Sequence, residues 1–295
     1  MASARPLTLL ESLPPGLLHA LDLMRQAMDA LDSVVVAYSG GVDSSLVAAI
    51  AAERLGDRAI AVTGVSPALA PHLLEEARSQ AHWLGLKHRE IPTAELDISS
   101  YTSNPPDRCY ACKRELHGLL AQIRIDVGAS QVLDGVNLDD LQDHRPGLRA
   151  ARERDVRSPL AEAGIDKSGV RQLSRALGLP WWDKPAQPCL ASRFPYGEPI
   201  TATRLRRVGA AEAWLREKGF GDVRVRSQGE TARIELPSNV LPGVCLSLAT
   251  GSLRQEMVDA FRALGFHTLA LDLEGLVSGK LNRDLAGPAT DHDRG

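Results

Sequence analysis

A glycine-rich turn near the start of the chain carries the residue types needed to hold an anion. The turn spans residues 39–44 and reads Ser-Gly-Gly-Val-Asp-Ser, between an apolar run at residues 34–38 and a helix-like segment at residues 44–55. A strand that passes through such a turn into a helix directs backbone N–H groups and the positive helix end at one spot. The pattern predicts a phosphate-binding loop, whereas the alternative is a glycine turn that merely joins a strand to a helix.

Each side chain of this loop has a chemical reason to be there. Gly40 and Gly41 let a phosphate approach the backbone, because a side chain at either position would hold it away. Asp43 would repel a phosphate unless a cation lay between them, so it implies Mg²⁺. We expect the phosphates of a bound ligand to be held by Ser39, Gly40, Gly41, Asp43 and Ser44, with Asp43 as the Mg²⁺ ligand and a catalytic residue.

This strand–turn–helix unit resembles the PP-loop of ATP pyrophosphatases, which cut ATP between its α and β phosphates. It is not a Walker A loop, which needs GxxxxGK[ST], because it contains no lysine, and it is not GxGxxG.

The bulk composition excludes several classes of protein. The chain has 295 residues, of which 44 % are hydrophobic, and a net charge of −3, so it has a packed core and no broad basic field for nucleic acid. Its N-terminus lacks the pattern of a secretory signal, and its apolar runs are too short to span a membrane. The four cysteines suit a reducing compartment. We expect a cytoplasmic protein that binds neither membrane nor nucleic acid.

Strand-like and helix-like segments alternate through the first two thirds of the chain. We expect strands at residues 33–38, 59–65, 87–91, 131–136 and 179–182, and helices at residues 16–30, 44–55, 70–84, 113–125 and 167–177. Such alternation predicts a parallel sheet with helices on both faces and ligands at the carboxyl ends of the strands. The expected fold class is α/β, with a Rossmann-like PP-loop domain over residues 1–200.

The chain changes character near residue 200. Prolines interrupt residues 184–200, and a helix is expected at residues 201–218. Polar and apolar residues alternate at 223–226 and 233–236, and a helix at 252–264 and a strand at 267–273 follow. These segments predict a smaller α+β domain over residues 201–285, followed by a flexible tail at residues 286–295.

Three cysteines form a second candidate site. Cys109 and Cys112 have the spacing of a metal-binding or redox pair, in a loop that leads into a helix. Cys189 is flanked by Lys184 and Arg193, whose charges favour a thiolate that attacks or binds iron. Three cysteines are one fewer than a fully protein-ligated [4Fe–4S] cluster needs, which leaves one iron for a sulfide or a substrate. Our hypothesis is that they meet beside the nucleotide site.

Simpler interpretations of the cysteines stay open. Cys109 and Cys112 suit a structural zinc site with His144 as a further ligand, and Cys189 suits a buried apolar position. Cys245 lies among apolar residues, and we expect it in the core of the small domain.

The PP-loop, residues 108–113 and residues 184–193 together resemble the LarE-type ATP-dependent sulfur transferases. The resemblance extends over residues 15–284 and includes the stretches at 134–147, 157–160, 223–226, 232–235 and 271–279. It implies that ATP activates a carboxylate of a pyridinium mononucleotide as an acyl adenylate, releasing pyrophosphate. Sulfur then displaces AMP, on the way to a nickel-pincer cofactor. Some members sacrifice the cysteine at the position of Cys189, whereas members with three cysteines carry sulfur on a [4Fe–4S] cluster, and this chain resembles the latter.

The resemblance also implies roles for single residues. Cys189 and Arg193 are the expected catalytic residues, and Gly135 and Asp140 are expected to contact ATP or pyrophosphate. Asp140 is the first choice in an acidic cluster with Asp139 and Asp143 that suits Mg²⁺ or ribose. The substrate phosphate is assigned to Arg224 and Arg226, which alternate onto one strand face. Glu212 matches a position near the substrate, or is a surface glutamate.

Rival functions share parts of this pattern. A tRNA-thiolating PP-loop enzyme would use the same ATP chemistry, a ligase of the GMP or NAD synthetase kind would use ammonia, and an inactive nucleotide-binding module would lack turnover. Val277 stands where the sulfur transferases usually have an arginine, and Lys280 would replace that charge as a point charge and not as a planar fork. This departure from the family pattern concerns the identity of the substrate and not the ATP chemistry. The family tendency favours a homo-oligomer.

Overall fold

The chain divides into two compact units, and each is described by itself. The computed structural model describes residues 5–142, 147–277 and 279–285. Unit 1 is Met1–Pro188 and unit 2 is Cys189–Gly295. The division falls before the predicted boundary at residue 200 and assigns Cys189 to unit 2.

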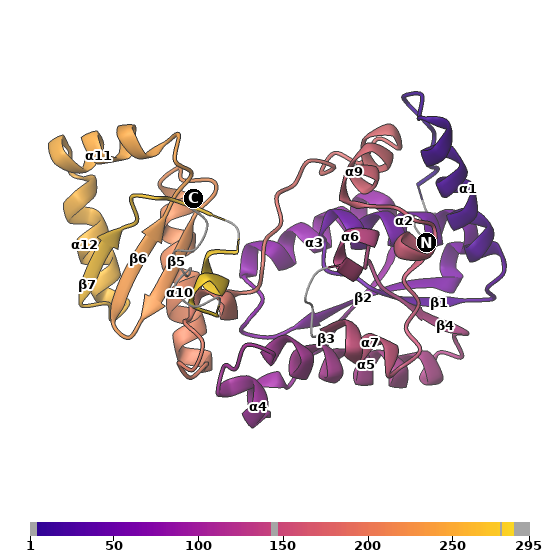
Figure 1. The fold of residues 1–295 in the computed structure, drawn as a ribbon, viewed down its shortest axis with the longest axis horizontal. Helices are drawn as coiled ribbons and strands as arrows, with labels where there is room; N and C mark the ends of the chain where they lie inside the picture. Colours follow the sequence, from indigo (N-terminus) through magenta and orange to yellow (C-terminus); the bar gives the residue numbers. More distant parts are fainter. Residues whose placement is uncertain (1–4, 143–146, 278, 286–295) are drawn as a thin grey trace, which may run out of the picture. The chain divides into compact units, whose positions relative to one another are not determined.

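Unit 1 is built on a parallel four-stranded sheet with the strand order β3-β2-β1-β4 (Figure 1). The strands are β1 (Val34–Ala37), β2 (Ala59–Val65), β3 (Lys87–Pro92) and β4 (Gln131–Leu133). Its longer helices are α1 (Pro15–Asp29), α2 (Val42–Leu55), α3 (Pro71–Leu84), α5 (Arg108–Asp126) and α9 (Lys167–Ala176). Four short helices complete it: α4 (Ser99–Thr102), α6 (Leu138–Gln142), α7 (Gly147–Arg152) and α8 (Pro159–Glu162).

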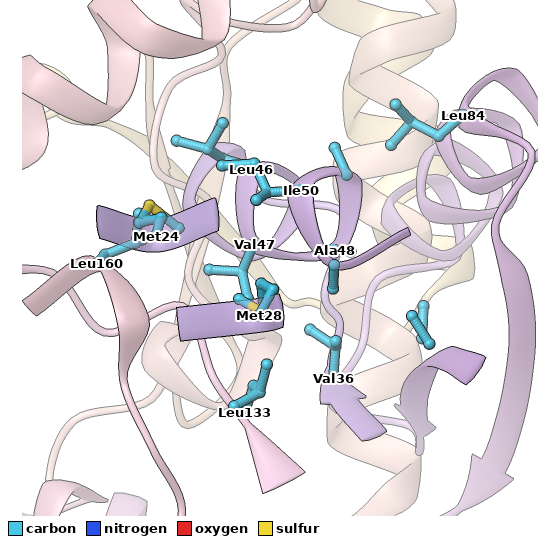
Figure 2. Close-up of a cluster of buried hydrophobic side chains, with 14 of the residues drawn as sticks. Met24, Met28, Val36, Leu46, Val47, Ala48, Ile50, Leu84, Leu133 and Leu160 are labelled. Atoms are coloured by element: carbon cyan, nitrogen blue, oxygen red, sulfur yellow. The ribbon is translucent and has the colours of Figure 1, made fainter. Parts of the chain in front are cut away.

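Helices cover both faces of this sheet because successive strand residues point to opposite sides. Val34 and Val36 pack into the cluster that includes α1, α2 and α9, whereas Val35 packs with Leu120 and Ile123 of α5. Helix α2 is almost wholly buried, and Figure 2 shows its apolar side chains in one cluster with side chains of α1, β1 and β4. The predicted α/β fold with helices on both faces is confirmed.

Unit 2 contains a mixed three-stranded sheet of β5 (Arg224–Gln228), β6 (Thr231–Glu235) and β7 (Thr268–Leu271) (Figure 1). β5 and β6 are antiparallel, and β6 and β7 are parallel. Three helices, α10 (Ala202–Glu217), α11 (Leu241–Thr250) and α12 (Leu253–Ala263), and two 3₁₀ turns, η3 (Leu190–Arg193) and η4 (Lys280–Leu285), complete the unit. Phe261 and Phe266 are fully buried in it. The smaller α+β part predicted from the sequence is therefore present.

Three local predictions are wrong. Residues 179–182 form a turn and not a strand, since Pro180 lacks the N–H that a strand interior would use. α5 begins at Arg108, so Cys109 and Cys112 lie within the helix and not in a loop before it. Cys245 is exposed on α11 and not in the core.

Two glycines fix the loop between β1 and α2 against its neighbours. Gly40 has φ of +68°, and a Cβ there would lie 2.9 Å from the Cα of Ala77 in α3. A Cβ on Gly135, just after β4, would lie 2.7 Å from the backbone nitrogen of Ser44. The first turn of α2 is therefore pressed against α3 on one side and the end of β4 on the other.

We expect Gly135→Ala to lower the free energy of unfolding by about 1–3 kcal/mol, because the added methyl group would meet backbone atoms that cannot swing away. Urea unfolding followed by circular dichroism measures the change. The control is Gly16→Ala in α1, where a Cβ meets nothing within 4 Å and no loss is expected. Equal stability of the Gly135 variant and wild type would contradict the close approach.

Candidate active site

The loop at residues 39–44 has the form of an anion site at the N-terminus of α2. Ser39 Oγ lies 3.1 Å from Ser44 Oγ, and Ser44 Oγ donates a hydrogen bond to the Gly41 carbonyl at 3.2 Å. Asp43 lies in the first turn of the helix. The structure thus brings together the five loop residues singled out in the sequence, where the backbone N–H groups of a 14-residue helix begin.

Asn137 connects the two carboxylates predicted to lie near the nucleotide. Its Nδ2 donates to Asp43 Oδ1 at 2.8 Å, and its Oδ1 accepts from the backbone N–H of Asp140 at 3.1 Å. Asn137 and Asp140 are 1 % and 5 % exposed. Asp140 also lies 3.4 Å from Lys167 Nζ. Asp43 and Asp140 therefore belong to one polar cluster at the carboxyl end of the sheet.

Asn137 is a residue whose importance the sequence argument missed. It lies in the stretch at residues 134–147 that contributes to the family resemblance, and it follows β4 by four positions. The rule that ligands gather at the carboxyl ends of parallel strands would have singled it out.

The turn after β4 is held by a buried carboxylate. Asp134 accepts hydrogen bonds from Ser158 Oγ at 2.8 Å and from the Val136 N–H at 3.1 Å. Burial raises the pKa of Asp134 above its ordinary value. These contacts fix the chain around Gly135, which packs on Ser44.

Cys109 and Cys112 lie one helical turn apart at the start of α5, on the same face. Cys109 is exposed and Cys112 is half-buried. Within the described ranges, no three His, Cys, Asp or Glu side chains are grouped to hold a metal ion. Cys189 belongs to the other unit, so the convergence of the three cysteines stays a prediction. Asp143 and His144 lie outside the described residues.

Cys189 begins the η3 turn of unit 2 and is exposed, which contradicts the alternative of a buried apolar cysteine. Its carbonyl accepts from Arg193 Nη1 at 3.5 Å, and Arg193 Nη1 also donates to Ser192 Oγ at 2.9 Å. Arg226 Nη1 donates to the Ser192 carbonyl at 2.6 Å. Two arginines therefore hold the turn that presents the Cys189 thiol.

A fully buried carboxylate, that of Glu212, holds the guanidinium group of Arg193 in place. Arg193 Nε and Nη2 donate to the two oxygens of Glu212 at 2.7 and 3.1 Å. Glu212 also accepts from the Val225 N–H at 3.0 Å and from Arg216 at 3.1 Å. Burial is the largest single influence and raises the pKa of Glu212, but the charge and hydrogen bonds of Arg193, the Val225 N–H and the charge of Arg216 together lower it below its ordinary value. The alternative of Glu212 as a surface residue is wrong.

A second buried carboxylate holds Arg226. Arg226 Nε donates to Glu235 Oε2 at 3.0 Å, and the two side chains are 6 % and 0 % exposed. Arg224 is half-buried on the same strand. Burial, and then the nearby charges of Arg193 and Arg226, lower the pKa of Arg224. The three arginines named in the sequence therefore form one concentration of positive charge.

Arg193 and Arg226 border a basic pocket of about 200 Å³ within unit 2. Its lining residues are Arg193, Pro195, Arg226, Gln228, Arg233, Lys280, Leu281 and Arg283. Lys280 donates to Asp272 Oδ2 at 2.7 Å, so its charge is held in place at the pocket wall. Arg224 is not among the lining residues. Such a concave, cation-rich surface suits a small anion that carries a phosphate or carboxylates.

The sequence relates this geometry to known proteins. It matches the NAD synthase family over residues 20–114, which include the loop. It is 53 % identical to an uncharacterized protein of Synechocystis over 90 % of this chain and 97 % of that one. It is 38 % identical to pyridinium-3,5-bisthiocarboxylic acid mononucleotide synthase of Lactiplantibacillus plantarum, over 88 % of this chain and 92 % of that enzyme. The chain belongs to the family of this synthase.

This pyridinium synthase family uses ATP and has the PP-loop fold, as the structure of unit 1 does. A more partial match, 33 % identical over 58 % of this chain, is to tRNA-specific 2-thiouridylase MnmA of Azorhizobium caulinodans. It covers 54 % of that enzyme. In the described part of the chain, no helix is long and apolar enough to cross a membrane.

Replacing Glu212 tests whether it holds Arg193. We expect Glu212→Gln to lower the free energy of unfolding by about 3–5 kcal/mol at neutral pH, because a buried guanidinium loses its counter-charge. A carboxylate whose pKa is lowered by folding stabilises the protein above its unfolded pKa, here 4.5, and loses this contribution as pH falls through the folded value. The difference between wild type and variant should therefore shrink only below about pH 4.5.

Urea unfolding across a pH series measures both effects. Glu256→Gln is the matched control, since Glu256 pairs with Lys218 at the surface of the same unit. It should change the stability very little. Equal losses for the two variants, or a Glu212 effect independent of pH, would contradict the assignment.

Proposed function

We propose that the protein is an ATP-dependent sulfur transferase that thiolates a carboxylate of a pyridinium mononucleotide, in the biosynthesis of a nickel-pincer cofactor. The observation that carries this proposal is the basic pocket beside the Cys189 turn. It offers fixed positive charge to a substrate with a phosphate and carboxylates, and one of its lining residues, Arg193, belongs to the turn that follows Cys189. The similarity to the pyridinium synthase supports the same substrate class.

The pocket is suited to this substrate because its cations are held before the substrate arrives. Glu212 holds Arg193, Glu235 holds Arg226, and Asp272 holds Lys280. Guanidinium groups bind phosphate through paired N–H donors. Fixed donors need little reorganisation when an anion binds or when charge develops during a reaction. Arg224, beside the pocket, and Arg226 are the proposed phosphate contacts, and Arg193 is the proposed contact for the acyl phosphate.

The loop of unit 1 is the proposed binding site for ATP and for the pyrophosphate released from it. Ser39, Gly40, Gly41 and Ser44 hold pyrophosphate through hydroxyl and backbone N–H donors, and Gly135 and Asp140 complete the site. Asp43 offers a carboxylate oxygen at the loop, which is the ligand type that Mg²⁺ prefers. Bound there, Mg²⁺ would offset the negative charge of the phosphates.

The proposed chemistry has two displacement steps. A substrate carboxylate oxygen attacks the α-phosphorus of ATP, and the bond to the β-phosphate oxygen breaks to release pyrophosphate. A sulfur nucleophile then attacks the acyl carbon, and AMP leaves with its electron pair and the former carboxylate oxygen. Adenylation is needed because a free carboxylate is anionic and has a poor leaving group.

The sulfur donor is proposed from the three cysteines. Either Cys189 gives up its sulfur and becomes dehydroalanine, or Cys109, Cys112 and Cys189 hold a [4Fe–4S] cluster with one open iron. Anaerobic reconstitution with iron and sulfide distinguishes these routes. The cluster predicts visible absorbance that the triple Cys→Ala variant lacks, and equal iron binding by that variant would exclude it.

Thiolation of tRNA is the main alternative function. The partial match to a 2-thiouridylase is the reason to include tRNA in the functional test. A tRNA substrate would require a broad basic surface, and the chain carries a net charge of −3. The favoured substrate is therefore a small mononucleotide. Assembly as a homo-oligomer and action in the cytoplasm belong to the same proposal.

Pyrophosphate release provides the test of function. We expect release from ATP to require the biscarboxylated pyridinium mononucleotide, and Asp43→Asn to lower the rate by on the order of 100-fold through lost charge stabilisation. Cys189→Ser should still release a first equivalent of pyrophosphate but form no thiocarboxylate, as measured by mass spectrometry. Pyrophosphate release that is stimulated by tRNA, or that does not depend on the carboxylates of the pyridinium mononucleotide, would contradict the proposal.

A further inference from the structure

A lysine from a distant part of unit 1 reaches the phosphate loop. Lys184 Nζ donates to the Gly40 carbonyl at 3.2 Å and forms an ion pair with Glu76 of α3. The side chain of Lys184 is only 14 % exposed, whereas that of Glu76 is 41 % exposed. We propose that Lys184 exchanges Glu76 for the β- and γ-phosphates of ATP and then holds the pyrophosphate formed from them. This inference rests on the ATP chemistry proposed above.

The loop needs such a cation because it has none of its own. Residues 33–53 contain no lysine or arginine, and Asp43 and Glu76 add negative charge around the loop, whereas Asp140 is paired with Lys167. Backbone N–H groups alone would leave much of the phosphate charge unmatched. An ammonium group on a flexible stem is a common phosphate ligand in proteins.

The backbone that carries Lys184 is anchored, so only its side chain has to move. Arg171 of α9 donates to the carbonyl of Lys184 at 2.9 Å and to that of Trp182 at 3.4 Å. The N–H of Lys184 donates to the Trp181 carbonyl at 3.0 Å. The backbone of Lys184 is therefore held near the loop, and the proposed exchange requires only a movement of its side chain.

The exchange is favourable because the two anions differ in charge and exposure. Glu76 is partly exposed, so it regains water when Lys184 leaves, and ion pairs of this kind contribute little. Pyrophosphate carries more negative charge than the Glu76 carboxylate does. If Lys184 stayed on Glu76, the bound pyrophosphate would lack this cation. Lys184 also lies five residues before Cys189, so its contact would connect nucleotide binding to the segment that leads to the thiol.

Calorimetric binding of Mg-pyrophosphate and of AMP to the full chain tests the inference. We expect Lys184→Met to weaken pyrophosphate binding roughly 10- to 100-fold, the range for a lost charge-assisted hydrogen bond, and to leave AMP binding unchanged. Glu76→Gln should strengthen pyrophosphate binding, since it removes the competing anion. The double variant should lose that gain. Lys218→Met, which breaks the Lys218–Glu256 pair of unit 2, is the matched control and should change neither affinity.

A purely structural ion pair would give a different pattern. Glu76→Gln would then weaken binding as Lys184→Met does, and AMP and pyrophosphate would be affected alike. Either result, or no pyrophosphate binding by the wild type, would overturn the inference. The outcome is independent of the sulfur step, because a protein that binds pyrophosphate through Lys184 but leaves the pyridinium carboxylates unmodified would contradict the proposed function alone.

Discussion

The close packing around the first turn of α2 is the constraint on which unit 1 depends. Gly40 must adopt a left-handed conformation beside Ala77, and Gly135 must lack a side chain against Ser44. Asn137 then reaches Asp43 from the end of β4. Three separate segments therefore meet at the N-terminus of α2, which is the place where backbone dipoles favour phosphate. The buried α2 holds this arrangement rigid.

In unit 2, several positively charged side chains lie close together and must be held there. Its arginines lie close enough to repel one another: burial, and then the charges of Arg193 and Arg226, lower the pKa of Arg224. The buried carboxylates of Glu212 and Glu235 make the arrangement stable by pairing with Arg193 and Arg226 from behind. Buried ion pairs seldom add net stability, so their value here is geometric. They keep the donors aimed at an anion before it binds.

Local patterns made much of the fold predictable. The apolar strands, the amphipathic helices and the loop at residues 39–44 follow from short-range sequence, and the structure has them at nearly the predicted positions. The turn at 179–182 was mistaken for a strand because a short apolar run gives no periodicity to distinguish the two. α5 starts earlier than expected, after two prolines that suggested a longer loop.

Contacts between distant residues were the part that sequence could not supply. Nothing near Glu212 indicates that it is buried, because its partner Arg193 lies 19 positions away. Lys184 and Gly40 are 144 positions apart, and only the folded chain brings them together. Cys245 sits among apolar residues, but it is exposed on α11 together with Leu246, whereas its other neighbour Val244 is buried. The sequence pattern identifies residues whose chemistry suits a site. The packing of the folded chain determines which of these residues lie in contact.

The central claim is that a substrate carboxylate is activated by adenylation. The most direct measurement uses a pyridinium mononucleotide whose carboxylates carry heavy oxygen, with the AMP product examined by mass spectrometry. Adenylation followed by attack at the acyl carbon leaves one carboxylate oxygen on the phosphate, so the account predicts AMP with one heavy oxygen per turnover. Unlabelled AMP formed at the same rate would mean that water, and not the carboxylate, attacks ATP, and would contradict the account.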